Sequence, residues 1–270
     1  MARDVSVIKT LENADYHMHS TFSDGVLSPT QLVERAKANG IKIMALTDHD
    51  GVGGIAEAKE AGRACGVEVV AGIEFAVRTK EGIGLHMLGY DFDVRNEKLL
   101  AMVERTRKYR EERNKELIAV LCGMGFEMTM EEVIAEGGRD YAGKPNMARV
   151  MMKKGYIREW KEAFSEKTFE SPQVKSIKRK KPEAGEVLDV ILQAGGIPVL
   201  AHPGKIKRLG EKENGEFFKN AEKLVVALKA RGLMGIECFH TDHTKEDEEF
   251  FRALAEKLDL VITKGSDFHG

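Results

Sequence analysis

Histidines and carboxylates gather at the ends of short apolar segments of this 270-residue chain. In the stretch DYHMHSTFSDG, residues 15–25, two histidines stand one residue apart, and an aspartate follows five positions after the second. The chain has eight histidines: His17, His19, His49, His86, His202, His240, His243 and His269. His86 lies inside a strand-like segment, and nearly all the others stand at or just beyond the C-terminal end of one. Carboxylates accompany them: Asp24, Asp48, Asp50, Glu74, Asp242 and Asp267. Neutral imidazoles mixed with carboxylates, with no thiolate at these positions, suit Zn²⁺, Mn²⁺ or Fe²⁺.

Each of these residues taken singly also has an ordinary structural explanation. A lone histidine near a strand end is usually a hydrogen-bonded structural residue, and Asp48 or Asp50 is a candidate N-cap for a helix starting near Gly53. That explanation would have to hold for all eight histidines independently, so we favour a metal site. The ligands outnumber the four that one tetrahedral ion needs, which predicts two or three ions sharing a carboxylate. Such ions, about 3.5–4 Å apart, polarise a phosphoryl or carbonyl group and hold a hydroxide between them.

Seven segments have the short, apolar, β-rich character of strands. They lie near residues 13–17, 41–47, 67–73, 84–92, 197–201, 233–239 and 260–265. Helical patterns separate most of them. The first helix has Ser28 as N-cap, Pro29 and Gln31 in a capping box, and Gly40 at its end. This alternation predicts parallel strands joined by crossover helices. In a barrel of that kind the strand ends meet at one rim, which would bring the histidines and carboxylates together.

Residues from about 95 to 185 do not continue the alternation. The segments 95–126, 129–138 and 146–156 have helical patterns, and 168–185 is a basic connector with two prolines. We therefore predict two parts. Residues 1–98 and 186–270 would form a barrel that carries the metal site, and residues 99–185 a helical insertion that acts as a lid and selects the substrate.

The bulk composition is that of an ordinary soluble globular protein, with 42% hydrophobic and 32% charged residues. A formal net charge of −2 argues against binding of long nucleic acid or of an anionic membrane surface. No apolar run is long enough to span a bilayer, and MARDVSVIKT lacks the apolar core of a signal peptide. Cys65, Cys122 and Cys238 have no CxxC spacing, so we expect reduced thiols and a cytoplasmic protein. The sequence leaves the oligomeric state open.

Five ordered motifs, HMHSTFSDG, LTDHD, GIE, LAHPG and GSDFHG, resemble those of the PHP (polymerase and histidinol phosphatase) superfamily of metal-dependent phosphoesterases. The resemblance extends from about residue 13 to the C-terminus and includes the insertion. It implies an α/β fold, a distorted (β/α)7 barrel with a helical insertion, which carries up to three divalent ions of manganese, zinc or iron. The seven strand-like segments agree with it.

The resemblance also implies a ligand set for each ion. The first ion would be held by His17, His19, Glu74 and Asp267, and the second by Glu74, His86 and His202. The third would be held by Asp24, His49 and His269. Asp24 stands where some family members have a histidine, so we expect the affinity of the third site to differ from theirs. The sequence stops at Gly270 directly after the last motif, so we also expect a less enclosed third site. Asp48 would orient an imidazole.

The insertion is similar to that of the 3′,5′-nucleoside bisphosphate phosphatases, in which a GRPH-ARAL stretch leads into a helix over the active site. This chain has GKPNMARVMMKKGY there, with Lys144 in place of an arginine, Asn146 in place of the histidine, and Arg149 retained. We predict that Arg149 binds a substrate phosphate through its guanidinium fork. Further candidates for substrate binding are Lys144, Asn146, Lys178, Arg179 and Lys205. Lys180 and Lys181 are interpreted as part of a solvated loop.

These residues predict hydrolysis of a small, nucleotide-like phosphate monoester, such as a 3′,5′-nucleoside bisphosphate. A hydroxide bridging the first two ions would attack phosphorus, with Arg149 stabilising the charge and His240 protonating the leaving oxygen; Asp48 is the third catalytic candidate. Other phosphorylated substrates remain open: histidinol phosphate, a cyclic sugar phosphate, or the 5′ end of a short RNA. So do amide hydrolysis of the amidohydrolase kind and a non-catalytic metal-binding role. For His243, a surface position and a substrate contact both remain open.

Overall fold

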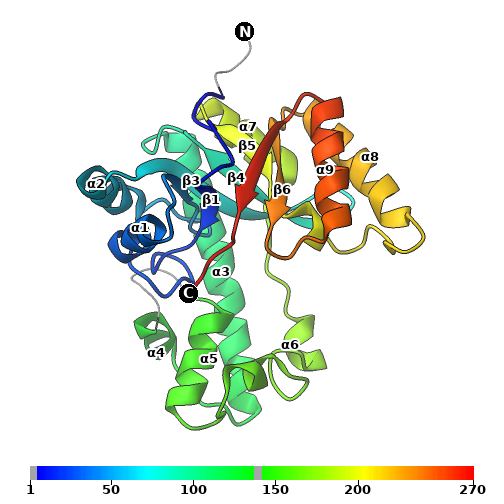
Figure 1. The fold of residues 1–270 in the computed structure, drawn as a ribbon. Coiled ribbons are helices and arrows are strands. Elements are labelled where there is room, and N and C mark those ends of the chain that lie inside the picture. The colour runs from blue at the N-terminus through cyan, green and yellow to red at the C-terminus, as the bar shows by residue number, and fades with distance from the viewer. Residues whose placement is uncertain (1–4, 137–141) are drawn as a thin grey trace.

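The computed structural model describes residues 5–136 and 142–270, and seven strands in them form one sheet that curves into a nearly closed barrel (Figure 1). The strands follow one another around the sheet in sequence order. They are β1 (Ala14–Met18), β2 (Ile43–Leu46), β3 (Glu68–Arg78), β4 (Gly84–Tyr90), β5 (Ile197–Leu200), β6 (Gly235–His240) and β7 (Val261–Gly265). Each strand overlaps one of the seven predicted segments, so the predicted distorted α/β barrel is confirmed.

The prediction that all strands run parallel is wrong for β4. This strand is antiparallel to both β3 and β5, whereas the other neighbouring strands pair in parallel. The reason lies in the connection between β3 and β4, since residues 79–83 are enough for a hairpin turn but too few for the crossover that a parallel pair needs. The sheet closes between β1 and β7 through backbone hydrogen bonds beside Met18 and Phe268.

Five helices cover the outside of the barrel: α1 (Pro29–Ala38), α2 (Ile55–Cys65), α7 (Ala184–Gln193), α8 (Glu216–Ala230) and α9 (Lys245–Lys257). The start of α1 is as predicted, because Ser28 Oγ accepts a hydrogen bond from Gln31 N while Gln31 Oε1 accepts one from Ser28 N. Gly40 follows the helix in the left-handed region, at φ +76°, and lets the chain turn toward β2. These local signals determine where β2 begins and therefore where the residues after it reach the rim.

The helical insertion lies beyond one rim of the barrel (Figure 1). It comprises much of α3 (Glu97–Gly123), then α4 (Met130–Ala135), α5 (Lys144–Lys153), the 3-10 turn η1 (Trp160–Phe164) and α6 (Pro172–Ser176). The predicted helical segments therefore form. Residues 137 and 138, at the end of the predicted segment 129–138, lie outside the described residues. No helix in the described part of the chain combines the length and the apolar character needed to cross a bilayer.

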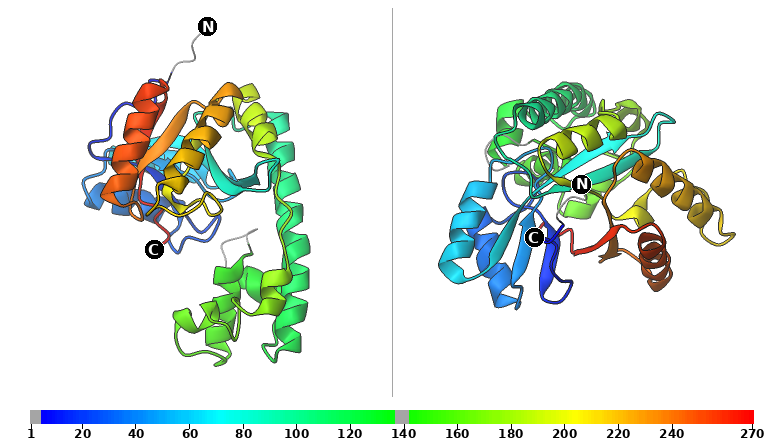
Figure 2. Two further views of the ribbon diagram at one scale, coloured as in Figure 1. Left: turned by 90° about the vertical axis from the view of Figure 1, so that its right-hand side faces the viewer. Right: turned by 90° about the horizontal axis from the view of Figure 1, so that it is seen from above.

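Helix α3 extends from the barrel into the insertion and belongs to the cores of both, as Figure 2 shows. Near its start, Leu99 and Met102 are buried in the barrel core. Near its end, Leu117 and Leu121 are buried in a separate core with residues of α4 and α5. A helix of this length measures about 40 Å. The boundary that we propose at residue 99 thus falls within a helix that both parts share, and that helix holds the insertion over the rim.

Candidate metal centre

The predicted metal ligands converge at the rim of the barrel that faces the insertion. They lie within or directly after six of the strands: His17, His19, His49, Glu74, His86, His202, Asp267 and His269. Their rings are close together, with centroids 4.2 Å apart for His19 and His269 and 4.6 Å apart for His19 and His49. Residues from the two ends of the chain therefore meet because their strands are neighbours in the barrel.

Glu74 lies at the centre of this cluster and is fully buried. Its Oε1 is 2.7 Å from His86 Nδ1 and 3.0 Å from His202 Nε2. Its Oε2 faces three more ring nitrogens at 2.9–3.3 Å, those of His49, His17 and His19. Burial by itself would raise the pKa of Glu74, but the surrounding imidazoles outweigh it and hold that pKa well below its usual range. One carboxylate thus presents an oxygen to each of two groups of histidines, as a bridging ligand does.

Four groups of donor atoms in the described residues are compact enough for a cation, since within each group the atoms lie within 4.8 Å of one another. One of them, which was not predicted, consists of His17, Glu237 and His240. The other three are His17, His19, Glu74 and Asp267; Glu74, His86 and His202; and His19, Asp24, His49 and His269. These three reproduce the ligand sets that the resemblance implies, with His19 added to the third. The third group is the most open, because 35% of the His269 side chain is exposed, against 30% of His86 in the second group and 16% of Asp267 in the first.

The buried polar atoms of the first group are better placed to bind a metal ion than to form hydrogen bonds with one another. His17 Nε2, His19 Nε2 and Glu74 Oε2 are buried and have no hydrogen-bond partner among the described residues. A buried polar atom left in this way costs about 1–3 kcal/mol, and a divalent cation between the three would satisfy them together. Burial lowers the pKa of His19, but the carboxylates of Asp267 and Glu74, 3.2 and 3.3 Å from its Nε2, outweigh it and raise that pKa to about 10. The group therefore attracts positive charge.

Two imidazoles are held from behind so that one nitrogen faces the cluster. His17 Nδ1 lies 2.9 Å from Glu237 Oε1, and His269 Nδ1 lies 2.7 Å from the carbonyl oxygen of Asp267. Because these oxygens only accept hydrogen bonds, each Nδ1 is a donor. The Nε2 lone pair of each ring is then directed at the cluster, where it is suited to bind a metal.

Asp48 was predicted to orient an imidazole and to assist catalysis, but its described hydrogen bonds go to serines rather than to a ring. Its carboxylate accepts from Ser20 N, Ser20 Oγ and Ser23 Oγ, each at 2.7 Å. Ser23 Oγ lies 3.4 Å from His19 Nδ1. Since the Ser23 hydroxyl donates to Asp48, its oxygen is left to accept from the ring. Asp48 is therefore placed to position His19 through Ser23.

Glu237, which the sequence reasoning missed, is a fully buried carboxylate in β6. It connects two ligand sets, because it holds His17 through Oε1 and accepts a hydrogen bond from His202 N through Oε2, at 2.8 Å. Burial raises the pKa of Glu237, yet the charge of His17 outweighs burial and lowers it, so the carboxylate is ionised. A signal was available in the sequence, since GIECF repeats the Gly-Ile-Glu around Glu74, and a charged residue inside an apolar strand needs a buried partner.

Two residues of the cluster have backbone conformations that residues other than glycine rarely adopt. The φ angle is +25° at His202 and +55° at Asp267. Such conformations cost about 1–3 kcal/mol each and persist where the surroundings enforce them. Here His202 N is held by Glu237, and Asp267 N donates to the carbonyl oxygen of His17 at 2.9 Å. Strain of this kind collects at functional sites, which agrees with a metal centre at this rim.

Gly265 lets β7 pass directly behind the His17–Glu237 pair, because a Cβ atom there would collide with both side chains. We expect Gly265→Ala to destabilise the protein by about 1–3 kcal/mol, as overpacking of a core does. Urea unfolding would measure this change. Gly123→Ala is the matched control, since a Cβ at the end of α3 meets nothing within 4 Å. Equal stability of the two variants would contradict the close approach of β7.

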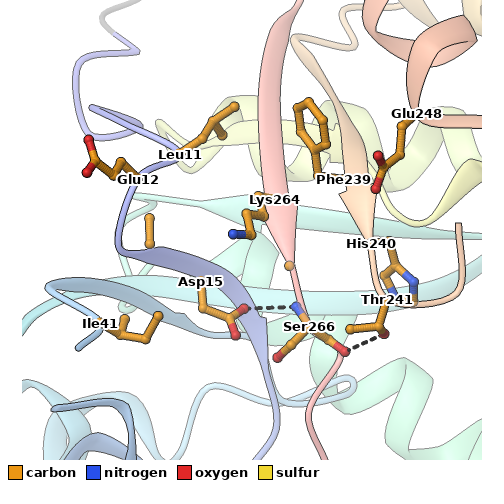
Figure 3. Close-up of a pocket in the computed structure, with 12 residues that line it drawn as sticks. Leu11, Glu12, Asp15, Ile41, Phe239, His240, Thr241, Glu248, Lys264 and Ser266 are labelled. Atoms are coloured by element: carbon orange, nitrogen blue, oxygen red, sulfur yellow. Dashed lines mark hydrogen bonds between the residues drawn. The ribbon is translucent and has the colours of Figure 1, made fainter. Parts of the chain in front are cut away.

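His240 stands between the cluster of donor atoms and a cavity of about 700 Å³ on the flank of the barrel, which lies over β7 and extends from β1 to β6 (Figure 3). The ring is buried, and its Nδ1 accepts a hydrogen bond from Asp242 N at 3.0 Å. The proton of the neutral ring is then on Nε2, which lies 3.5 Å from Asp267 Oδ2. On the other side of the cavity, Asp15 Oδ1 accepts from Ser266 N at 3.0 Å and ties β1 to the end of β7.

His243 has a structural role in this fold. Its Nδ1 donates to the carbonyl oxygen of Cys238 at 3.0 Å, and its Nε2 accepts from Gly204 N at 3.1 Å. Both ring nitrogens are thus occupied by backbone groups. The ring fastens the loop after β5 to β6 and leaves no nitrogen for a substrate.

Two cation-lined pockets flank the cluster and meet at His86 and Lys181. One, of about 320 Å³, is lined by His86 and His202 together with Lys181, Lys205, Lys207 and Arg208. The other, of about 330 Å³, lies between the rim and the insertion and is lined by His49 and His86 with Arg110, Arg113, Lys144, Arg179 and Lys181. The interpretation of Lys181 as a solvated residue is wrong, because its side chain is half-buried and lines both pockets. Burial and the nearby Arg179 lower its pKa. Lys180 is exposed, as predicted, and pairs with Glu112.

Asp50 anchors two of these cations and is not a helix cap. Its buried carboxylate forms ion pairs with Arg110, from α3, and with Arg179, from the connector. Gly54 occupies the N-cap position of α2 instead. Burial raises the pKa of Asp50, but Arg110 and Arg179 outweigh it and lower that pKa. The two guanidinium groups are therefore held beside His49, at the side of the cluster that faces the insertion.

Three predicted substrate residues lie away from the two pockets, whereas Lys144 and Lys205 line them. Arg149 donates to the carbonyl oxygen of Glu136 at 3.1 Å and stacks on Trp160. Asn146 is buried at the start of α5, where its side chain accepts from the backbone of Gly143. Lys178 is exposed. The position of Arg149 in its motif pointed to a phosphate, but the packing of α5 turns its side chain toward Trp160.

A seven-stranded α/β barrel with histidine- and carboxylate-rich donor groups at its strand ends defines a metal-dependent hydrolase. Residues 15–194 match the family described as PHP domain. The chain therefore belongs to the PHP family, and the membership predicted from its motifs is confirmed.

Relatives of the chain are phosphoesterases that differ in substrate. A protein from Haemophilus influenzae, named 5′-3′ exoribonuclease, is 33% identical over 94% of this chain and 89% of its own length. A phosphoribosyl 1,2-cyclic phosphate 1,2-diphosphodiesterase from Eggerthella lenta is 30% identical over 95% and 94%. A 3′,5′-nucleoside bisphosphate phosphatase from Chromobacterium violaceum is 29% identical over 96% and 88%. This protein is accordingly a metal-dependent phosphoesterase, as predicted.

The resemblance to solved structures includes the insertion as well as the barrel. A protein from Bifidobacterium adolescentis, described as a candidate metal-dependent phosphoesterase, superposes with a TM-score of 0.82 at 31% identity. The match covers 95% of this chain and 87% of the other. Barrel and insertion are therefore arranged similarly in the two proteins.

Proposed function

We propose that the protein hydrolyses a small, nucleotide-like phosphate monoester, such as a 3′,5′-nucleoside bisphosphate. The observation that carries this proposal is the pair of cation-lined pockets that meet at His86, a residue of the second donor group. A phosphate at the metal groups then has positive charge on both sides, which suits a substrate with a second phosphate nearby. The relative named for nucleoside bisphosphates supports the same substrate class.

The three donor groups are our proposed sites for two or three divalent ions of manganese, zinc or iron. The first and second groups share Glu74, which would bridge their ions. When bound, the ions would polarise the phosphoryl oxygens and activate a water molecule. His17 and His269 would bind through Nε2, since Nδ1 of each ring is already a donor to an oxygen.

The cations of the pockets would bind and orient the substrate. Arg179 and Lys181 approach the cluster from the insertion side, and Arg179 is held in place by Asp50. Lys205 approaches from the loop after β5, where its Nζ lies 3.3 Å from Asp267 Oδ2. His240 is the proposed donor of a proton to the leaving oxygen, because its Nε2 carries the ring proton and faces the cluster.

Phosphate release from a panel of about twenty small phosphates by the manganese-loaded protein tests this function. The panel includes adenosine 3′,5′-bisphosphate, histidinol phosphate, a ribose cyclic phosphate and a 5′-phosphorylated dinucleotide. We expect turnover of the bisphosphate, and loss of turnover when His17 and Asp267 are both replaced by alanine. Absence of release from every compound, with metal shown to be bound, would rule the proposal out.

Lys181 and Lys180 offer a matched pair of variants for the pockets. We expect Lys181→Met to lower kcat/KM by about 10–100-fold, because a hydrogen bond to a charged group contributes roughly 1.5–3 kcal/mol. Lys180→Met removes the same charge from an exposed position and should leave kcat/KM within about twofold of the unaltered protein, since exposed ion pairs contribute little. Steady-state kinetics on the best substrate measures both. Similar losses in the two variants would indicate a general effect of charge and contradict a direct contact of Lys181.

A second candidate function is removal of nucleotides from the 5′ end of a short RNA. The similarity to the protein named 5′-3′ exoribonuclease favours it, as do the cations that extend from the cluster onto the insertion. The net charge of the whole chain still disfavours long nucleic acid. In the same panel, release of mononucleotides from the 5′-phosphorylated dinucleotide would identify this activity.

A further inference from the structure

The insertion is positively charged although the whole chain is not. Residues 142–183 contain twelve lysines and arginines and only five acidic residues, whereas the whole chain has 42 basic and 44 acidic residues. Lys144, at the start of α5, belongs to this segment and also lines the pocket beside the metal cluster. An anionic substrate that begins at the cluster therefore meets further positive charge on the insertion.

The same segment carries every exposed aromatic ring of tyrosine, tryptophan or phenylalanine in residues 5–136 and 142–270. These rings are Tyr156, Trp160 and Phe164, each 38–39% exposed. Trp160 and Phe164 form a row with the buried Phe169, with ring centroids 5.5 Å and then 5.4 Å apart. Lys144 Nζ lies 5.2 Å from the centre of the Phe169 ring. The row thus begins beside Lys144, a residue that lines the pocket, and continues along the insertion to Trp160.

A second cation stands at the far end of the row. Arg149 Cζ lies 5.9 Å from the centre of the Trp160 ring, and its hydrogen bond to the carbonyl oxygen of Glu136 holds it there. Exposed rings with cations beside them are the composition of surfaces that bind single-stranded nucleic acids, because the rings stack on bases and the cations neutralise phosphates. A surface for a protein partner or a second copy would need a wider apolar area. Exposed charged residues instead flank Trp160 and Phe164 along the chain: Arg158, Glu159, Lys161, Glu162, Glu166 and Lys167.

We propose that Trp160 and Phe164 form a stacking platform for the nucleobases of a short single-stranded RNA whose 5′ phosphate lies at the metal cluster. This inference rests on the second candidate function, removal of nucleotides from the 5′ end of a short RNA, and deepens it, since it assigns the insertion the task of selecting substrates with several bases. The pocket cations hold the phosphates nearest to the reacting ester. The row then receives the bases that follow along the strand.

Trp160 is the one tryptophan of the chain, so its fluorescence reports directly on this surface. The zinc-loaded, full-length protein would be titrated with a 5′-phosphorylated hexanucleotide RNA that carries hydrolysis-resistant phosphorothioate linkages. We expect saturable quenching by the RNA and none by inorganic polyphosphate, which has the charge but no bases. Binding of a labelled RNA, measured by anisotropy, should weaken about tenfold in Trp160→Ala and in Phe164→Ala, and much less in Trp160→Phe. Tyr156→Ala, outside the row, is the matched control and should bind normally.

Equal RNA affinity of the unaltered protein and the Trp160→Ala and Phe164→Ala variants would overturn the proposal. So would quenching by polyphosphate equal to that by RNA, or a change of oligomeric state in the variants without a change in RNA binding. The last result would make the rings a contact between copies of the chain. Release of mononucleotides from the 5′-phosphorylated dinucleotide by the unaltered protein is measured separately, and its absence would contradict the second candidate function rather than the stacking platform.

Discussion

Replacing Glu74 by glutamine is expected to abolish most of the activity and to lower the amount of metal that the protein retains. The carboxylate of Glu74 presents one oxygen to His86 and His202 and the other to the first donor group, so glutamine keeps its shape but removes the charge that two ions would share. Loss of the hydrogen-bond partner of a metal ligand typically lowers metal affinity or activity about 10–100-fold. Loss of a bridging ligand should lower them by more than that. Steady-state kinetics and elemental analysis of the purified protein measure the two effects.

Glu81→Gln is the matched control for this experiment, because Glu81 is an exposed glutamate in the turn between β3 and β4. It should retain both metal and activity. A Glu74→Gln protein with unchanged metal content and more than about a tenth of the activity would contradict the bridging role of Glu74.

Replacing Glu237 by glutamine is expected to weaken metal binding by about 10–100-fold while the fold is retained. The two oxygens of Glu237 accept hydrogen bonds from His17 Nδ1 and His202 N, whereas glutamine has only one acceptor oxygen and presents a donor to the second group. His17 or the backbone of His202 then loses its support. Calorimetric titration of the metal-free protein with Zn²⁺ measures the change independently of activity, and circular dichroism monitors the fold.

Two control variants test whether the effect depends on the position of Glu237 rather than on the loss of one negative charge. Glu249→Gln removes an exposed carboxylate from α9 and should not change zinc affinity. Glu237→Asp keeps both acceptor oxygens and should recover part of the affinity. Unchanged zinc affinity in Glu237→Gln would show that His17 and His202 hold their positions without this carboxylate.

The sequence alone predicted those features that local patterns determine. The capping box at Ser28 and the apolar segments of the seven strands are such features, and the structure shows both. The gathering of the histidines and carboxylates at one rim could also be predicted, since carboxyl ends of neighbouring parallel strands meet there whatever lies between them in the sequence. Their division into three ligand sets was implied by the resemblance to the PHP superfamily, and the donor groups agree with it. Their role as metal ligands stays a proposal. The direction of β4 was predictable too, because its connection to β3 is too short for a crossover.

Only the tertiary structure decided which side chains support the cluster from other elements. Glu237 in β6 holds His17 in β1, and Asp50 receives Arg110 from α3. Lys180 and Lys181 are adjacent and chemically identical, yet only Lys181 lines the pockets beside the cluster. Which side of a connector or helix meets the barrel depends on how α3 and the insertion pack against it. The spacing of residues within one segment does not predict that packing, because the contacts involve residues far apart in the chain.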